Sequence, residues 1–317
     1  MSLTRQSKLM ESDMMNAKQV CLLCQSNDDL QRSHIVPAFV FRWIKSSSLS
    51  GFLRDGTMPN RRIQDGPTRR WLCSSCEDRF SAWEASFAQE VFYPFLNGGA
   101  VTHRYSSWMA LFCASLCWRT LKLALLECEN SFLYPERSKL VEKALDHWRE
   151  FMFERKSDPG EFEFHFVPIN RIQPINGASV HPFINRYLSL GVDAVILENK
   201  TNLIVYVKLP KMVVLGMIQP EFLEDWEDTK IQAESGCITD KPFSVPEVFF
   251  QFLNRRASLL EDASGKLSSF QNDKISNLLG TDLRKTGDSA YMQALRLDVG
   301  LSDLEAALPK LNKTEET

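Results

Sequence analysis

The sequence predicts an α+β fold. Two C-x-x-C pairs, at residues 21–24 and 73–76, indicate a cysteine-based module near the N-terminus. Helical spacing of apolar residues dominates 75–154, whereas alternating and β-rich runs dominate 162–218. These patterns place the cysteine module first, followed by a helical middle, a small antiparallel sheet and a helical C-terminal part.

The composition is that of an ordinary globular protein, since 44% of the 317 residues are hydrophobic and 24% are charged. The net charge of −3 provides no general attraction to nucleic acid or to acidic membranes. Residues 1–82 nevertheless carry 12 Lys/Arg against 8 Asp/Glu, a net of +4. The N-terminal part is therefore the better candidate for contact with a polyanion.

No membrane segment or export signal is predicted. The first 20 residues are polar and carry charges of both signs, unlike a signal peptide. The longest apolar stretch, Trp108–Leu126, contains Arg119 and Lys122, and its uncharged run is shorter than a membrane span. We therefore expect a buried helix there, no membrane association and a cytoplasmic protein.

The predicted elements begin with a short helix over 38–45, which has Pro37 at its first turn. A polar stretch at 46–70 indicates a hairpin or an extended excursion. A longer helix is predicted over 75–95, because apolar residues there repeat at steps of three and four: Phe80, Trp83, Phe87 and Val91.

Further helices are predicted over 107–128 and 137–154, and again from 245 to 279. Between them, Phe162, Phe164 and Phe166 alternate with polar neighbours, as in a strand. Three short β-rich runs predict an antiparallel meander: 194–197, 203–207 and 212–218. These patterns divide the chain into six regions: a flexible N-terminus (1–16), a cysteine module (17–100), a helical region (101–159), a meander region (160–220), a mainly helical region (221–308) and a flexible tail (309–317).

The paired cysteines predict a structural Zn²⁺ site with four ligands: Cys21, Cys24, Cys73 and Cys76. Two residues between cysteines let one turn of backbone aim both sulfurs at one ion, and two such pairs complete a tetrahedron. A knuckle followed by a helix-borne pair is the treble-clef arrangement. The alternative is two buried or redox-active thiol pairs, although no βαβ context of a redox C-x-x-C is visible.

A histidine motif, Ser33-His34-Ile35-Val36-Pro37, lies between the two pairs. The order of C-x-x-C, His-Ile-x-Pro and a helix-borne C-x-x-C resembles the HNH (His-Asn-His) endonucleases of the four-cysteine type, over about residues 20–95. A wider resemblance covers most of the chain. It is to uncharacterised bacterial proteins with S-H-I-[IV]-P and L-C-x-x-C-E-x-x-F-S-x-x-E signatures, the second of which stands at Leu72–Glu84.

The nuclease resemblance implies a metal-dependent endonuclease that cleaves phosphodiesters in DNA or RNA. It implies that His34 is the general base, that Glu77 occupies the last metal-ligand position, and that Glu84 supplies a second carboxylate from the same helix face. Carboxylates suit Mg²⁺ or Mn²⁺. The chain lacks the family's asparagine and second histidine. The alternative is therefore a non-catalytic zinc module for protein or nucleic-acid interaction.

Five arginines lie between the cysteine pairs, and their guanidinium groups could follow a nucleic-acid backbone: Arg54, Arg61, Arg62, Arg69 and Arg70. The alternative is that Asp55 and Asp65 pair with some of them. Farther along, Asp193, Glu198 and Lys200 resemble the acidic and lysine residues of another nuclease class. We interpret that pattern as chance, because the acids flank one short strand and the lysine falls in its turn.

Overall fold

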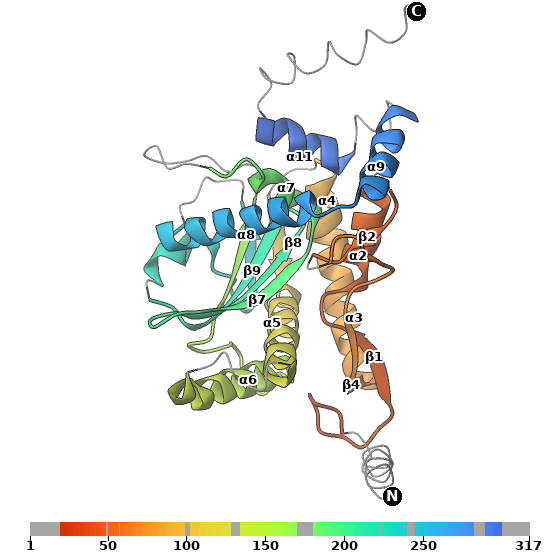
Figure 1. Cartoon of the computed structure of the whole chain (residues 1–317). Helices are drawn as coiled ribbons and strands as arrows, with labels where there is room; N and C mark the ends of the chain where they lie inside the picture. The colour runs from red at the N-terminus through yellow and green to blue at the C-terminus, as the bar shows by residue number, and fades with distance from the viewer. Residues whose placement is uncertain are drawn as a thin grey trace, which may run out of the picture.

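The described part of the chain is a mixture of α-helices and antiparallel sheets (Figure 1), which confirms the predicted α+β class. The predicted flexible ends, 1–16 and 309–317, and also Cys128 lie outside it. The structure, a computed structural model, describes residues 20–48, 50–56, 58–98, 102–127, 134–169, 180–221, 223–239, 245–281 and 289–299.

The N-terminal part is a strand pair followed by a long helix. β1 (Leu30–His34) pairs antiparallel with β4 (Thr68–Cys73), and α3 (Ser74–Phe87) begins directly after β4. The helix continues through a π-helical segment, η1 (Ala88–Phe92), into α4 (Tyr93–Leu96). The insert between the paired strands contains the predicted short helix and a small hairpin: α2 (Ala38–Ser47), β2 (Leu53–Arg54) and β3 (Arg62–Ile63).

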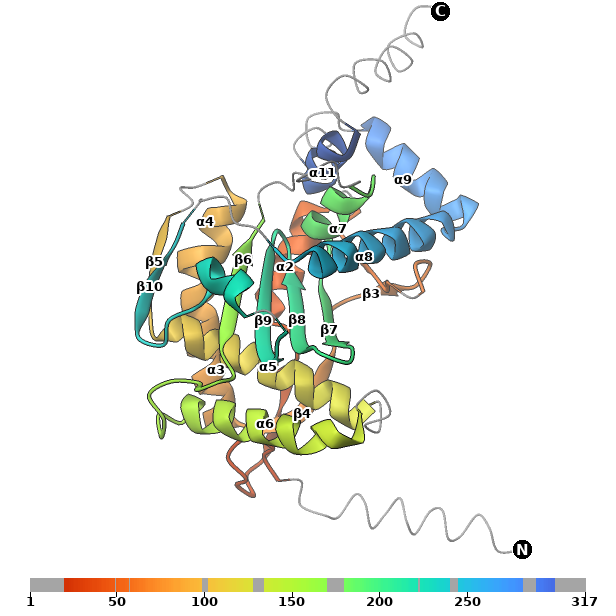
Figure 2. The same cartoon turned by 90° about the vertical axis from the view of Figure 1, so that its left-hand side faces the viewer.

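A four-stranded antiparallel sheet forms the second half of the fold (Figure 2). Its order is β6-β9-β8-β7, with bounds β6 (Phe164–Pro168), β7 (Asp193–Glu198), β8 (Leu203–Leu209) and β9 (Met212–Gln219). The predicted meander is confirmed in β7, β8 and β9, and β6 adds a strand beside β9. Every residue of β8 is buried because both faces of the sheet are covered, which explains the continuous apolar run 203–207.

Helices cover the two faces of the sheet. The buried helix α5 (Trp108–Glu127) packs between α3 and strands β8 and β9, and α6 (Ser138–Met152) lies beside it (Figure 1). The opposite face packs against α8 (Glu247–Gly265). By length and composition α5 could cross a membrane, but 72% of the relevant window is buried inside the fold, as in the core helix of a soluble protein.

The sequence analysis did not predict two features. β5 (His103–Ser106) pairs with β10 (Ser235–Ile238) across a long stretch of chain, and α7 (Ile184–Leu190) precedes β7. All three of these elements are short, and their sequences have weak periodicity, so their tertiary neighbours stabilise them. The remaining elements are η2 (Pro135–Arg137), η3 (Glu224–Thr229), α9 (Ser269–Thr281) and α11 (Ala290–Val299).

One apolar cluster runs through the fold, from Cys21 to Ile238. It contains residues of the cysteine module, of α5 and α6, and of one face of the sheet. The regions predicted at 17–100, 101–159 and 160–220 therefore share a single hydrophobic core. A cavity in the cysteine module can consequently receive side chains from α5.

Lys208 on β8 is a charge-bearing group buried on the other face of the sheet, beside Tyr187 of α7. Its side chain is almost fully buried, and its ammonium group donates a hydrogen bond to the carbonyl oxygen of Tyr187. Burial lowers the pKa of Lys208 to about 7, although Asp193 opposes the shift. Between pH 7 and about pH 10.4, the unfolded chain therefore binds more protons at this residue than the folded chain does. Through this group, stability should rise with pH across that window.

Lys208→Met should therefore raise the free energy of unfolding at pH 7.5 by about 2 kcal/mol. The difference from the unmodified protein should shrink as the pH approaches 10. Urea unfolding at several pH values measures it, with the exposed Lys200→Met as the control. A difference that is independent of pH would show that Lys208 is charged in the folded protein throughout this range.

Candidate functional site

The four predicted cysteines form one cluster, in which the ligand atoms all lie within 4.8 Å of one another. The sulfurs of Cys24 and Cys73 are 3.6 Å apart. A tetrahedron with Zn–S bonds of about 2.3 Å has edges of about 3.8 Å, whereas a disulfide bond is about 2.05 Å long. All four are free cysteines. The cluster can therefore hold a metal ion and is consistent with structural zinc.

Local backbone geometry aims these sulfurs at one point. Gln25 has φ 66°, and its N–H donates to the carbonyl of Cys21, so the first pair sits on a tight turn. Cys73 is the last residue of β4, and its N–H donates to the sulfur of Cys21 at 3.4 Å. Burial opposes ionisation of Cys73, but hydrogen bonds from the Ser75 hydroxyl and the Cys76 N–H lower its pKa to about 6. A thiolate, the form that binds metal, is thus favoured at this position.

A cavity of about 440 Å³ lies beside the cysteine module, between the β1–α2 connection and α3. Its lining includes all three residues for which the resemblance implies catalytic roles, together with two arginines and a glutamine from η1: His34, Glu77, Glu84, Arg42, Arg119 and Gln89. The residues from α3 and η1 recur at helical spacing, so one continuous helix face forms a wall. π-Helical segments are frequent at functional sites.

His34 is the last residue of β1, and its ring is oriented by a carboxylate. The Nε2 atom lies 2.9 Å from Oδ2 of Asp65. Burial opposes ionisation of Asp65, but hydrogen bonds from His34 and the N–H of Gly66 bring its pKa below the ordinary value. An ionised Asp65 that accepts the Nε2 proton leaves Nδ1 as the proton-accepting nitrogen. Such a pairing is typical of a histidine that acts as a base.

The sequence analysis considered Asp65 only as a partner for arginine. The strand register explains its position, because His34 faces Thr68 in the β1–β4 pair, and the N–H of Ile35 donates to the carbonyl of Pro67. These contacts bring the residues just before β4 to the end of β1. The pairing of β1 with β4 is the feature that would have predicted the contact between His34 and Asp65. It joins strands that lie more than 30 residues apart in the sequence.

Glu84 reaches the cavity in an ion pair. Its Oε1 lies 2.8 Å from Nη2 of Arg119, a residue of α5 that is only 2% exposed. Another nitrogen of the same guanidinium group, Nη1, donates to the carbonyl oxygen of His34 at 2.7 Å. The charge of Glu84 is therefore compensated by a buried arginine that the sequence analysis noted only as a break in an apolar run.

Glu77 presents a different environment. Its Oε1 is buried, and among the described residues it has no hydrogen-bond partner. A buried carboxylate oxygen without a partner is costly, so this atom fits a site for a cation or a proton donor. In the described part of the chain, the four cysteines are the one group of three or more His, Cys, Asp or Glu residues close enough to hold an ion together. A second ion would thus need oxygens from water or substrate, which Mg²⁺ commonly uses.

The five predicted nucleic-acid-binding arginines face several neighbours. Arg54 and Arg62 donate to the side-chain oxygen of Gln271 in α9, at 3.0 and 3.3 Å. Arg69 pairs with Glu127, at the end of α5. These three side chains therefore make contacts within the protein.

The remaining two, Arg61 and Arg70, are exposed. None of the five lines the cavity, where the exposed arginine is Arg42 of α2. Arg42 has no hydrogen-bond or ion-pair partner within the described ranges, so its guanidinium group is available to a ligand. The sequence analysis missed Arg42 because it lies within the apolar pattern of the 38–45 helix.

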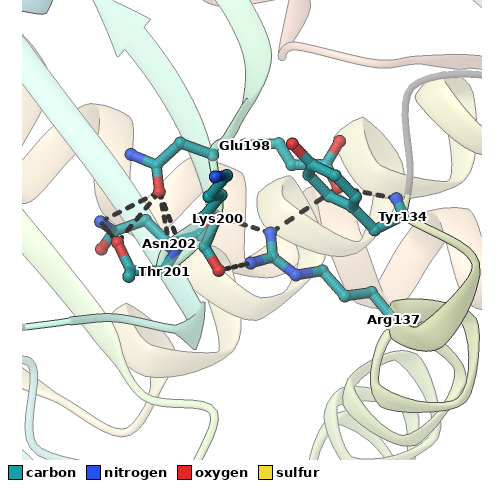
Figure 3. Close-up of polar contacts among 7 residues, drawn as sticks. Tyr134, Arg137, Glu198, Lys200, Thr201 and Asn202 are labelled. Atoms are coloured by element: carbon teal, nitrogen blue, oxygen red, sulfur yellow. Dashed lines mark hydrogen bonds and ion pairs between the residues drawn. The ribbon is translucent and has the colours of Figure 1, made fainter.

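The second acidic pattern does not converge on one point, in agreement with its interpretation as chance. Asp193 and Glu198 stand at opposite ends of β7. Asp193 accepts two hydrogen bonds from Arg256, at 2.6 and 2.7 Å. Glu198 instead faces Arg137, which also donates to the carbonyl oxygen of Lys200 at 2.7 Å (Figure 3). Arg137 thereby anchors the β7–β8 turn to the start of α6.

Comparisons with protein-family models, with curated proteins and with solved structures found no match for this chain.

Proposed function

We propose that the protein is a zinc-stabilised, metal-dependent nuclease that hydrolyses phosphodiesters of DNA or RNA in the cavity beside α3. The observation that carries this proposal is the composition of the cavity lining. His34, oriented by an ionised Asp65, lines the same cavity as Glu77, which has a buried oxygen without a partner among the described residues. A base and an acidic ligand beside one cavity are the minimum that metal-assisted hydrolysis requires.

The proposal includes a treble-clef module of the HNH type. A knuckle with the first cysteine pair, the β1–β4 strand pair and a helix that begins at the second pair support this assignment. Zinc would have a structural role, because all four ligands are cysteines and no coordination position is left for substrate. The zinc ion would thereby hold the turn that precedes β1 against the end of β4 and the start of α3.

In the proposed reaction, a water molecule attacks phosphorus and transfers its proton to Nδ1 of His34. The bond from phosphorus to the leaving oxygen breaks, and that oxygen takes a proton from solvent. A Mg²⁺ or Mn²⁺ ion held by Glu77 would supply neutralisation of the charge on the phosphate. Arg42 lines the cavity and has no partner within the described ranges, so its guanidinium group can donate two hydrogen bonds to phosphate oxygens.

The test is the rate of cleavage of plasmid DNA and of single-stranded RNA with Mg²⁺ or Mn²⁺. His34→Ala should lower kcat by at least about 1000-fold, because the proton acceptor is lost. Its zinc content should remain that of the unmodified protein. His181→Ala is a matched control, since His181 is similarly exposed and also faces a carboxylate, that of Glu261 at 3.5 Å. Equal cleavage by the unmodified protein and by His34→Ala would remove His34 from the mechanism.

The second candidate is a non-catalytic zinc module that binds protein or nucleic acid. The ion pair between Glu84 and Arg119 favours it, because a compensated carboxylate is a poorer ligand for a second metal ion. Absence of cleavage across DNA and RNA substrates, together with retained zinc, would support this candidate.

A further inference from the structure

We propose that Arg119 is a positioning residue, which holds both His34 and Glu84 in place from the core helix α5. The expected effect on cleavage rests on the nuclease function proposed above. The positioning itself is a structural property and can be measured without activity.

The guanidinium group of Arg119 is almost fully engaged. Nη1 donates to the carbonyl oxygen of His34 at 2.7 Å, and Nη2 lies 2.8 Å from Oε1 of Glu84. Nε donates to the carbonyl oxygen of Ser115 at 3.2 Å, and the group lies 5.0 Å from the ring centre of Phe80. One planar fork therefore joins the end of β1, the last turn of α3 and the preceding turn of α5.

Because the guanidinium group of Arg119 is occupied by these contacts, the two arginines that line the cavity have different roles. Arg119 is 2% exposed, and its charge is matched by Glu84, so it could bind phosphate only by giving up that partner. Arg42 is exposed and lacks a partner among the described residues, which suits direct contact with substrate. Arg119 therefore acts through its contacts: it fixes the backbone of His34 relative to α3, the helix that carries Glu77 and Glu84, and so determines where the base lies in the cavity.

The contact also explains how the hydrophobic core affects the cavity. α5 packs against both the sheet and α6, so its position is set by the second half of the fold. Through Arg119, that position is transmitted to the backbone of His34. A lysine could keep one contact but could not span both acceptors, because it carries a single nitrogen rather than a planar fork.

The test compares Arg119→Met and Arg119→Lys with Arg137→Met. Arg137 is a matched control, because it is also buried, also faces a glutamate and also donates to two backbone carbonyls, but lies at the β7–β8 turn, outside the cavity lining (Figure 3). Both Arg119 variants should lower kcat by about 100-fold with KM within about twofold, since a misplaced base affects the chemical step. Arg137→Met should lower Tm to a similar extent and leave kcat unchanged.

A second measurement applies even if the protein has no nuclease activity. The imidazole NMR signals of His34, assigned by comparison with His34→Gln, should shift in both Arg119 variants and stay in place in Arg137→Met. Unchanged His34 signals in the Arg119 variants would overturn the positioning role, as would equal losses of kcat in the Arg119 and Arg137 variants. Shifted signals together with an inactive unmodified protein would retain the positioning role and reject the nuclease function.

Discussion

Replacement of Cys73 by serine should release zinc and unfold the N-terminal part of the chain. Cys73 ends β4, contacts the sulfur of Cys24 and receives Ser75 as a hydrogen-bond partner, so its loss opens the cluster at the junction of strand and helix. Structural zinc contributes about 10–16 kcal/mol of apparent binding free energy, whereas a whole domain is stable by about 5–15 kcal/mol. No set of local contacts would compensate for that loss.

Elemental analysis should find one zinc ion in the unmodified protein and a substoichiometric amount in Cys73→Ser. Hydrogen exchange should accelerate across β1, β4 and the start of α3. Cys237→Ser is the control, because Cys237 is exposed and lies outside the cluster. Full zinc content in Cys73→Ser, with unchanged exchange, would show that the four sulfurs do not share an ion.

Glu77→Gln and Glu84→Gln should have opposite consequences, although the two carboxylates lie on one helix and line one cavity. Glu77→Gln removes the charge of a carboxylate that has a buried oxygen without a partner among the described residues. Its kcat at limiting Mg²⁺ should fall by about 100-fold, and more Mg²⁺ should restore part of the activity. Its stability should be unchanged or slightly higher, because no interaction with the described part of the chain is lost.

Glu84→Gln instead leaves the buried guanidinium group of Arg119 without a counter-charge. The free energy of unfolding should fall by about 3 kcal/mol, and the Mg²⁺ concentration that gives half-maximal activity should change little. Urea unfolding and Mg²⁺ titrations of the cleavage rate measure the two effects. If Glu84→Gln raised the Mg²⁺ requirement more than Glu77→Gln does, Glu84 and not Glu77 would be the ligand of the ion.

Local patterns predicted much of the fold. Helical spacing of large apolar residues predicted α3, because a helix that buries one face must repeat such residues every three to four positions. The long apolar run predicted α5 as a buried helix, and α6 was also predicted. The β-rich runs separated by short turns predicted the β7–β8–β9 meander for an equally local reason. The short helix α2 was predicted too, and the insert hairpin is one of the two alternatives expected there.

The same kind of pattern predicted the cysteine cluster, since C-x-x-C spacing limits where two sulfurs can point. The partners of individual side chains did not follow from such patterns. The five insert arginines looked alike in the sequence, yet Arg54 and Arg62 contact α9, and Arg69 contacts α5.

By itself, the sequence determined the class of fold, the four cysteines that can hold a metal ion and the identity of three residues that line one cavity: His34, Glu77 and Glu84. Only the tertiary structure decided that Asp65 orients His34, that Arg119 compensates Glu84, and that Glu77 has an oxygen without a partner in the described part of the chain. The physical reason is the range of the interactions. Periodicity and motif spacing act over a few residues, whereas Arg119 meets His34 across 85 positions of the chain, through the packing of a core that no local pattern describes.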